Sequence, residues 1–125
     1  MPPHGCGGTL IASQWILTSA LCAGSPYIPA NFTIVLGEHD KSNSSESQIP
    51  RMVVTISKII THPPNNSSFI NNIALLKLTE EVDLNIYTPS CIAETSDNFE
   101  GQRAWAYGEK IVILIKYTRS LLFLF

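Results

Sequence analysis

Short runs of β-branched and apolar residues, separated by turn-forming residues, restrict what this chain can fold into. Val53, Ile56 and Ile59 lie in one such run, and Pro63–Ser68 is one of the turn-like segments between runs. β-Branched side chains favour strands, whereas proline, asparagine and serine favour turns. No long helical pattern occurs. The pattern predicts six strands, at Gly8–Ala12, Trp15–Thr18, Phe32–Glu38, Met52–Thr61, Ile73–Leu78 and Gln102–Tyr107.

Many short strands without a long helix predict an all-β fold, either an antiparallel barrel or a sandwich. The length of 125 residues fits one domain, and 45% apolar with 14% charged residues suits a buried core. The net charge of −2, with no basic run, argues against nucleic acid as a partner. Since no phosphate-binding glycine loop occurs, no cofactor is expected.

Five motifs occur in order along the chain: Cys6-Gly-Gly-Thr-Leu-Ile with Trp15-Ile-Leu-Thr-Ser-Ala-Leu-Cys, Leu36-Gly-Glu-His-Asp, Ile59-Ile-Thr-His-Pro, Asn71-Asn-Ile-Ala-Leu-Leu-Lys-Leu and Ala104-Trp-Ala-Tyr-Gly. Together they resemble the chymotrypsin/trypsin-like serine proteases. The resemblance implies an antiparallel β-barrel similar to the first of that family's two barrels, with the second barrel missing. It also predicts a partial protease domain over residues 1–108 and a divergent apolar tail over residues 109–125.

Two residues that the resemblance aligns with the catalytic triad are substituted. The position of the family's catalytic histidine holds Leu21, which has no lone pair and cannot accept a proton at any pH. The position of the aspartate that orients the histidine holds Asn72. In a serine protease triad, this change of aspartate to asparagine costs about 10⁴ in turnover, because the amide favours the wrong imidazole tautomer.

The family's nucleophile lies in Gly-Asp-Ser-Gly-Gly-Pro, and no Gly-x-Ser-Gly-Gly sequence occurs in these 125 residues. The same family segment supplies oxyanion-hole amides. The family's Ile-Val-Gly-Gly start, whose freed amine activates the zymogen, is also missing. The resemblance therefore implies a member of a serine endopeptidase family without an intact catalytic site, and we expect no activity from the chain as written.

Other residues with catalytic or metal-binding chemistry form no recognisable site. His4, His39 and His62 match family positions that are not catalytic, so a relocated base is not expected. Ser19 matches a small buried residue of the family, and Trp15 is expected in the core. No cluster of histidine, cysteine and carboxylate has ligand spacing, so no metal is expected.

Three cysteines leave at least one without an intramolecular partner. The resemblance implies a disulfide between Cys6 and Cys22, and a crosslink over this span contributes roughly 3 kcal/mol in the loop-entropy model. Cys91 resembles a family cysteine that pairs with a propeptide segment, which is missing here. The alternative is that Cys91 is a buried free thiol.

The family and four glycosylation sequons favour secretion. The chain opens at Met1-Pro2-Pro3 and not with a signal peptide, and a protein starting there would remain in the cytosol, neither glycosylated nor oxidised. The candidate glycosylation sites are Asn31, Asn43, Asn65 and Asn66.

The apolar tail, with two short apolar runs at Ile111–Ile115 and Leu121–Phe125, is shorter than the roughly 20 residues of a membrane-spanning helix. A membrane anchor is therefore not expected. The tail is either an added strand or translated intron or frameshifted sequence that replaces the second barrel.

Three functional interpretations remain. The chain is an inactive fragment or homologue of a trypsin-like serine endopeptidase, a secreted non-catalytic module that binds proteases or protein substrates, or the product of a degenerate gene. The sequence does not separate the second from the third.

Overall fold

The computed structural model describes residues 6–23, 28–37, 49–62, 71–107 and 112–116 of the chain. The chain divides into two compact units, Met1–Cys91 and Ile92–Phe125. The predicted boundary after residue 108 stays a prediction.

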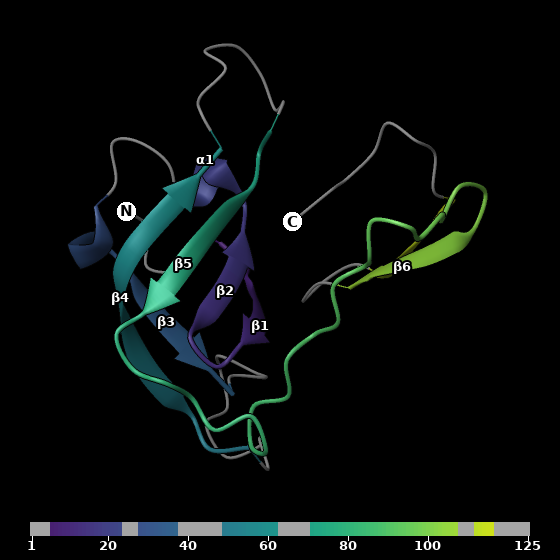
Figure 1. The fold of residues 1–125 in the computed structure, drawn as a ribbon. Helices are drawn as coiled ribbons and strands as arrows, with labels where there is room; N and C mark the ends of the chain where they lie inside the picture. Colours follow the sequence, from purple (N-terminus) through teal and green to yellow (C-terminus); the bar gives the residue numbers. More distant parts are fainter. Residues whose placement is uncertain (1–5, 24–27, 38–48, 63–70, 108–111, 117–125) are drawn as a thin grey trace. The chain divides into compact units, whose positions relative to one another are not determined.

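The first unit is one curled antiparallel sheet (Figure 1). Its strands follow the order β1-β2-β5-β4-β3, so that β5, the last of the five in sequence, lies at the centre. A short helix, α1, follows β2, and a 3-10 turn, η1, precedes β3. The predicted all-β, single-barrel fold is thereby confirmed. The elements are β1 (Thr9–Ala12), β2 (Trp15–Thr18), α1 (Ala20–Ala23), η1 (Pro29–Asn31), β3 (Thr33–Leu36), β4 (Met52–Thr61) and β5 (Ala74–Leu78).

The core of this unit lies on the concave face of the sheet. Alternate residues of β2, β4 and β5 point to this face, because successive side chains of a strand project to opposite sides. Val54 and Leu78 are both 1% exposed and are the largest fully buried side chains. The other buried apolar residues of the cluster are Leu10, Ile16, Ala23, Ile56, Ala74, Leu76 and Val82.

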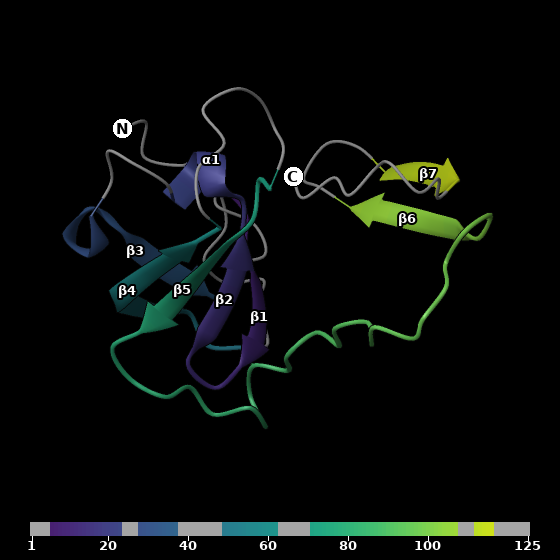
Figure 2. The same cartoon turned by 45° about the horizontal axis from the view of Figure 1, so that its top comes forward.

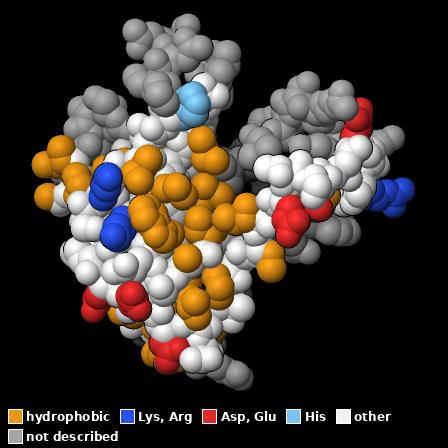
Figure 3. All heavy atoms as spheres, viewed as in Figure 1, with side chains coloured by type: hydrophobic (Ala, Val, Ile, Leu, Met, Phe, Trp, Pro, Cys, Tyr) orange, Lys and Arg blue, Asp and Glu red, His pale blue; other side chains and the backbone are white. Residues whose placement is uncertain are grey.

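A row of apolar side chains crosses the convex face. In the register of the sheet, Leu17 of β2 is opposite Leu75 of β5, which is opposite Ile60 of β4. Figure 3 shows hydrophobic side chains gathered on this side of the sheet. Trp15, expected in the core, is only half-buried and lies one residue before the inward-facing Ile16. The ammonium nitrogen of Lys77 lies 5.8 Å from the centre of its ring.

A glycine with a left-handed backbone follows β3. Gly37 has φ of 73°, and a Cβ at this position would lie 2.5 Å from the carbonyl oxygen of Pro50. The backbone therefore turns here at a place where any other residue would be strained. This turn lies one residue before the predicted strand end at Glu38, and Glu38 itself lies outside the described residues.

The second unit contains one described hairpin, formed by β6 (Arg103–Tyr107) and β7 (Val112–Lys116) in antiparallel pairing. Part of the apolar tail thus forms a strand, while the origin of the tail stays a prediction. Among the residues described, no helix is long and apolar enough to cross a lipid bilayer.

Candidate functional site

Ser19 immediately precedes α1, the short helix that contains Leu21. Its Oγ accepts a hydrogen bond from the backbone N–H of Cys22 at 3.3 Å. Its carbonyl oxygen accepts further bonds from the N–H groups of Cys22 and Ala23, each at 3.2 Å. This is an N-cap, in which the serine side-chain oxygen accepts from an amide of the first turn, here shared with the Ser19 carbonyl oxygen. Ser19 is buried at 8% exposure, and the cap is a role that the sequence interpretation missed.

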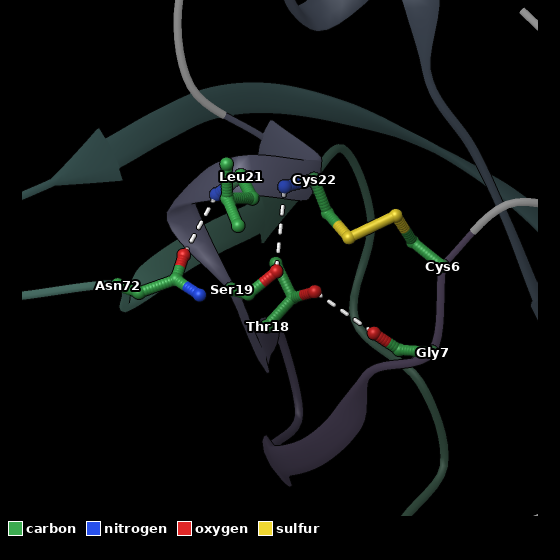
Figure 4. The surroundings of a disulfide bond; sticks show 7 residues. All are labelled: Cys6, Gly7, Thr18, Ser19, Leu21, Cys22 and Asn72. Atoms are coloured by element: carbon green, nitrogen blue, oxygen red, sulfur yellow. Dashed lines mark hydrogen bonds between the residues drawn. A yellow bond between two sulfur atoms is a disulfide. The ribbon is translucent and has the colours of Figure 1, made fainter. Parts of the chain in front are cut away.

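Asn72 supplies the second acceptor for the same helix. It follows Asn71, which has a positive φ of 59°, and the N–H of Ile73 donates to the carbonyl oxygen of Asn71 at 2.7 Å. This tight turn directs the amide of Asn72 towards α1, where its Oδ1 accepts a hydrogen bond from the backbone N–H of Leu21 at 2.8 Å (Figure 4). Two amides of the first turn, those of Leu21 and Cys22, thus each donate to a side-chain oxygen.

A disulfide fixes the other end of α1. Cys6 and Cys22 are bonded, with their Cα atoms 6.0 Å apart, as the resemblance implied. Beside the bond, the hydroxyl of Thr18 donates to the carbonyl oxygen of Gly7 at 2.8 Å (Figure 4). The segment before β1 is therefore held against the end of β2 by one covalent and one polar contact.

Cys91 is a free and exposed thiol. The alternative of a buried thiol is therefore wrong. The physical reason is local: all residues from Ser90 to Arg103 are exposed, and no strand or helix lies between β5 and β6 to cover the sulfur.

The side chain of Leu21 projects from α1 and is 65% exposed. The structure brings Leu21 and Asn72 together although 51 residues separate them in sequence. Between them they offer an aliphatic side chain and a neutral amide whose oxygen already accepts a backbone proton. Neither group can take a proton from a nucleophile.

The remaining predicted site residues add no chemistry to this pair. His62 is exposed just after β4, while His4 and His39 lie outside the described residues. In the described part of the chain, no group of three or more histidine, cysteine or carboxylate side chains could hold a metal ion. Of the candidate glycosylation sites, Asn31 lies in η1, and Asn43, Asn65 and Asn66 lie outside the described ranges.

A family model described as Trypsin matches residues 2–110, which is most of the chain. The chain belongs to the trypsin family. Chymotrypsin-like elastase family member 1 of Macaca fascicularis is 40% identical over 87 residues, 67% of this chain and 30% of that protein. The same protein of Rattus norvegicus is 39% identical over the same length. Ovochymase-2 of Mus musculus is 33% identical over 99 residues, 77% of this chain and 16% of that protein.

The chain therefore spans about 30% of the length of its elastase relatives. Within this span it contains the two positions that the resemblance to the trypsin family assigns to the base and the orienting acid. They meet in space at α1, through the Leu21–Asn72 hydrogen bond.

Proposed function

We propose that this chain is a non-catalytic member of the trypsin family. The observation that carries the proposal is Leu21, which stands at the position of the catalytic base with its backbone fixed by Asn72 and its side chain 65% exposed. Acyl transfer by a serine nucleophile requires a group that accepts the hydroxyl proton. Leucine has no lone pair with which to do so.

The proposal does not depend on what the rest of the protein contains. A serine nucleophile supplied from outside these residues would still face an aliphatic side chain at the position of the base. In a related triad mechanism, loss of the base alone lowers kcat by about 10⁶. Asn72 stands at the position of the orienting aspartate. Its neutral amide would supply no negative charge even if another base occupied the site.

The disulfide supports an oxidising compartment, because such bonds are rare in reducing cytosol. We infer that the protein is exported. The glycosylation sequons also favour export. Finding the native protein, oxidised at Cys6 and Cys22, in a secreted fraction would test this, and finding it reduced in the cytosol would contradict it.

A chimera tests the loss of activity independently of chain length. Residues Cys6–Leu78 replace the equivalent segment of an active chymotrypsin-like elastase, so that the nucleophile and the second barrel come from the relative. We expect kcat about 10⁶ below that of the parent enzyme, because the base is missing. Reverting both positions, Leu21→His with Asn72→Asp, is expected to restore most of it.

Single reversions serve as matched controls. Leu21→His alone is expected to remain about 10⁴ below the double reversion, since asparagine still orients the imidazole wrongly. Asn72→Asp alone is expected to restore nothing. Turnover of the unreverted chimera equal to that of the double reversion would overturn the proposal. An inactive but folded double reversion would show that the two substitutions are not the cause.

A further inference from the structure

The sequon Asn31-Phe32-Thr33 lies where a 3-10 turn leads into a strand, and of the four sequons it alone falls within the described part of the chain. η1 ends at Asn31 and β3 begins at Thr33 (Figure 2). The N–H of Phe32 donates to the carbonyl oxygen of Pro29 at 3.1 Å and so closes the turn. The backbone of Asn31 therefore belongs to this turn and lies outside the hydrogen-bonded ladder between β3 and β4.

Phe32 provides the packing at this junction. Its side chain is partly buried and packs against the core cluster, as do those of Ile34 and Leu36 in β3. Successive side chains of a strand project to opposite sides, so Thr33 points away from the core, and it is exposed. Ala30, which precedes Asn31, is also exposed. The hydroxyl of the sequon thus lies on the outer surface, while the aromatic side chain between the two sequon residues faces inward.

Attachment of an N-linked glycan joins the side-chain nitrogen of asparagine to C1 of the first sugar. The bond from C1 to the diphosphate of a lipid-linked oligosaccharide breaks, the lipid diphosphate leaves, and a base of the transferring enzyme takes the proton that the amide nitrogen loses. The enzyme recognises asparagine together with the hydroxyl two residues later. Because the sugar is transferred to the chain as it enters the secretory compartment, the reaction does not depend on how much of the family's domain follows.

We propose that Asn31 is an acceptor site for an N-linked oligosaccharide. The glycan is bulky and hydrated, so it requires a position at the surface of the fold. The turn at Asn31 meets this requirement, because its neighbours Ala30 and Thr33 are exposed and Phe32 holds the junction to the core from the inner side. The proposal rests on the export inferred above, since the lipid-linked donor meets only chains that enter the secretory pathway.

The test is expression of the whole chain behind a cleavable signal peptide in cultured animal cells. The signal delivers the chain to the transferring enzyme whether or not the native protein is exported. Glycosidase treatment converts a glycosylated asparagine to aspartate, which mass spectrometry locates. Digestion after lysine and arginine separates Asn31 from the other three sequons, because Lys41 is the first such residue in the chain. We expect conversion at Asn31 in most molecules that have formed the Cys6–Cys22 disulfide.

Two substitutions of Thr33 form a matched pair, because both change the same exposed side chain and leave the core untouched. Thr33→Ala removes the hydroxyl and is expected to abolish modification of Asn31. Thr33→Ser keeps a hydroxyl and is expected to retain it. Asn31→Gln, which removes the acceptor itself, is expected to reduce the mass of the secreted protein by one glycan.

Several outcomes would overturn the proposal. An unmodified Asn31 in a chain that carries a glycan at Asn43, Asn65 or Asn66 would do so, because that chain has reached the enzyme. Absence of glycan from every sequon would also overturn it, as would modification of Asn31 that persists in Thr33→Ala. If Asn31 is modified in the chain with the signal peptide while the native protein stays in the cytosol, the acceptor site is supported and only the inferred export fails.

Discussion

At the scale of single residues, Asn72 has a structural role that does not depend on the proposed loss of catalysis. As a neutral amide it cannot stabilise a protonated base. Its Oδ1 nevertheless accepts the backbone N–H of Leu21 at 2.8 Å and so anchors α1. Asn72 thus connects the segment before β5 to the first turn of α1.

This contact predicts different effects for two substitutions of Asn72. Asn72→Ala removes the acceptor, and we expect it to lower the free energy of unfolding by about 1 kcal/mol, the usual contribution of a helix-capping bond. Asn72→Asp keeps an acceptor oxygen and is expected to cost less. Urea denaturation followed by circular dichroism measures both. Equal losses for the two variants would mean that the Oδ1 contact contributes nothing.

At the scale of elements, α1 cannot be explained by its own sequence. Four residues are too few for a stable isolated helix, because the free energy needed to nucleate a helix exceeds the stabilisation from a single hydrogen-bonded turn. Its stability comes from Ser19 and Asn72 at the beginning and from the Cys6–Cys22 disulfide at the end.

Removal of the disulfide is therefore expected to be the most damaging change near α1. We expect the double substitution Cys6→Ser with Cys22→Ser to lower the free energy of unfolding by about 3 kcal/mol, from the loop entropy of the unfolded chain. Cys91→Ser is the control and is expected to have no effect, since Cys91 is exposed and unbonded. Chemical denaturation of the three proteins provides the comparison. If the double cysteine substitution lowered the free energy of unfolding by less than Asn72→Ala does, this account of α1 would be contradicted.

Strands were easier to predict than the site. The bounds of β2 and β4 agree with the prediction, because apolar alternation and turn residues are local signals. The short elements α1 and η1 were missed, as four and three residues are too few to show a helical period. Serine before a short helix is a known capping signal and could have identified Ser19. The contact between Leu21 and Asn72 spans 51 residues, and no local pattern encodes it.

Trp15 illustrates a different kind of error. Its strand was predicted correctly, but its side chain was assigned to the core because it lies in a strand pattern. Strand alternation gives the better answer, because Ile16 and Thr18 are buried and Trp15 therefore points to the convex face. There it lies beside Lys77.

At the scale of the whole molecule, the first unit depends on a small core. Folded domains are stable by about 5–15 kcal/mol, so a single cavity can remove much of the stability of such a unit. Leu78, at 1% exposure on the central strand β5, is in the position where such a cavity would cost most.

We expect Leu78→Ala to lower the free energy of unfolding of the first unit by about 2–5 kcal/mol. In a domain of low stability, this loss is enough to unfold much of the population at 37 °C. Leu84→Ala removes the same atoms from a residue that is 38% exposed and is expected to cost under about 1 kcal/mol. Thermal melts of the two variants compare them directly. Similar Tm values would mean that β5 does not lie at the centre of the core.

The exposed sulfur of Cys91 has a practical consequence. The other two cysteines are locked together, so a maleimide dye would attach at one known position without any mutagenesis. That position is the last residue of the first compact unit. A fluorophore there would lie at the sequence boundary between the two units, and its anisotropy would report the mobility of that segment of the chain.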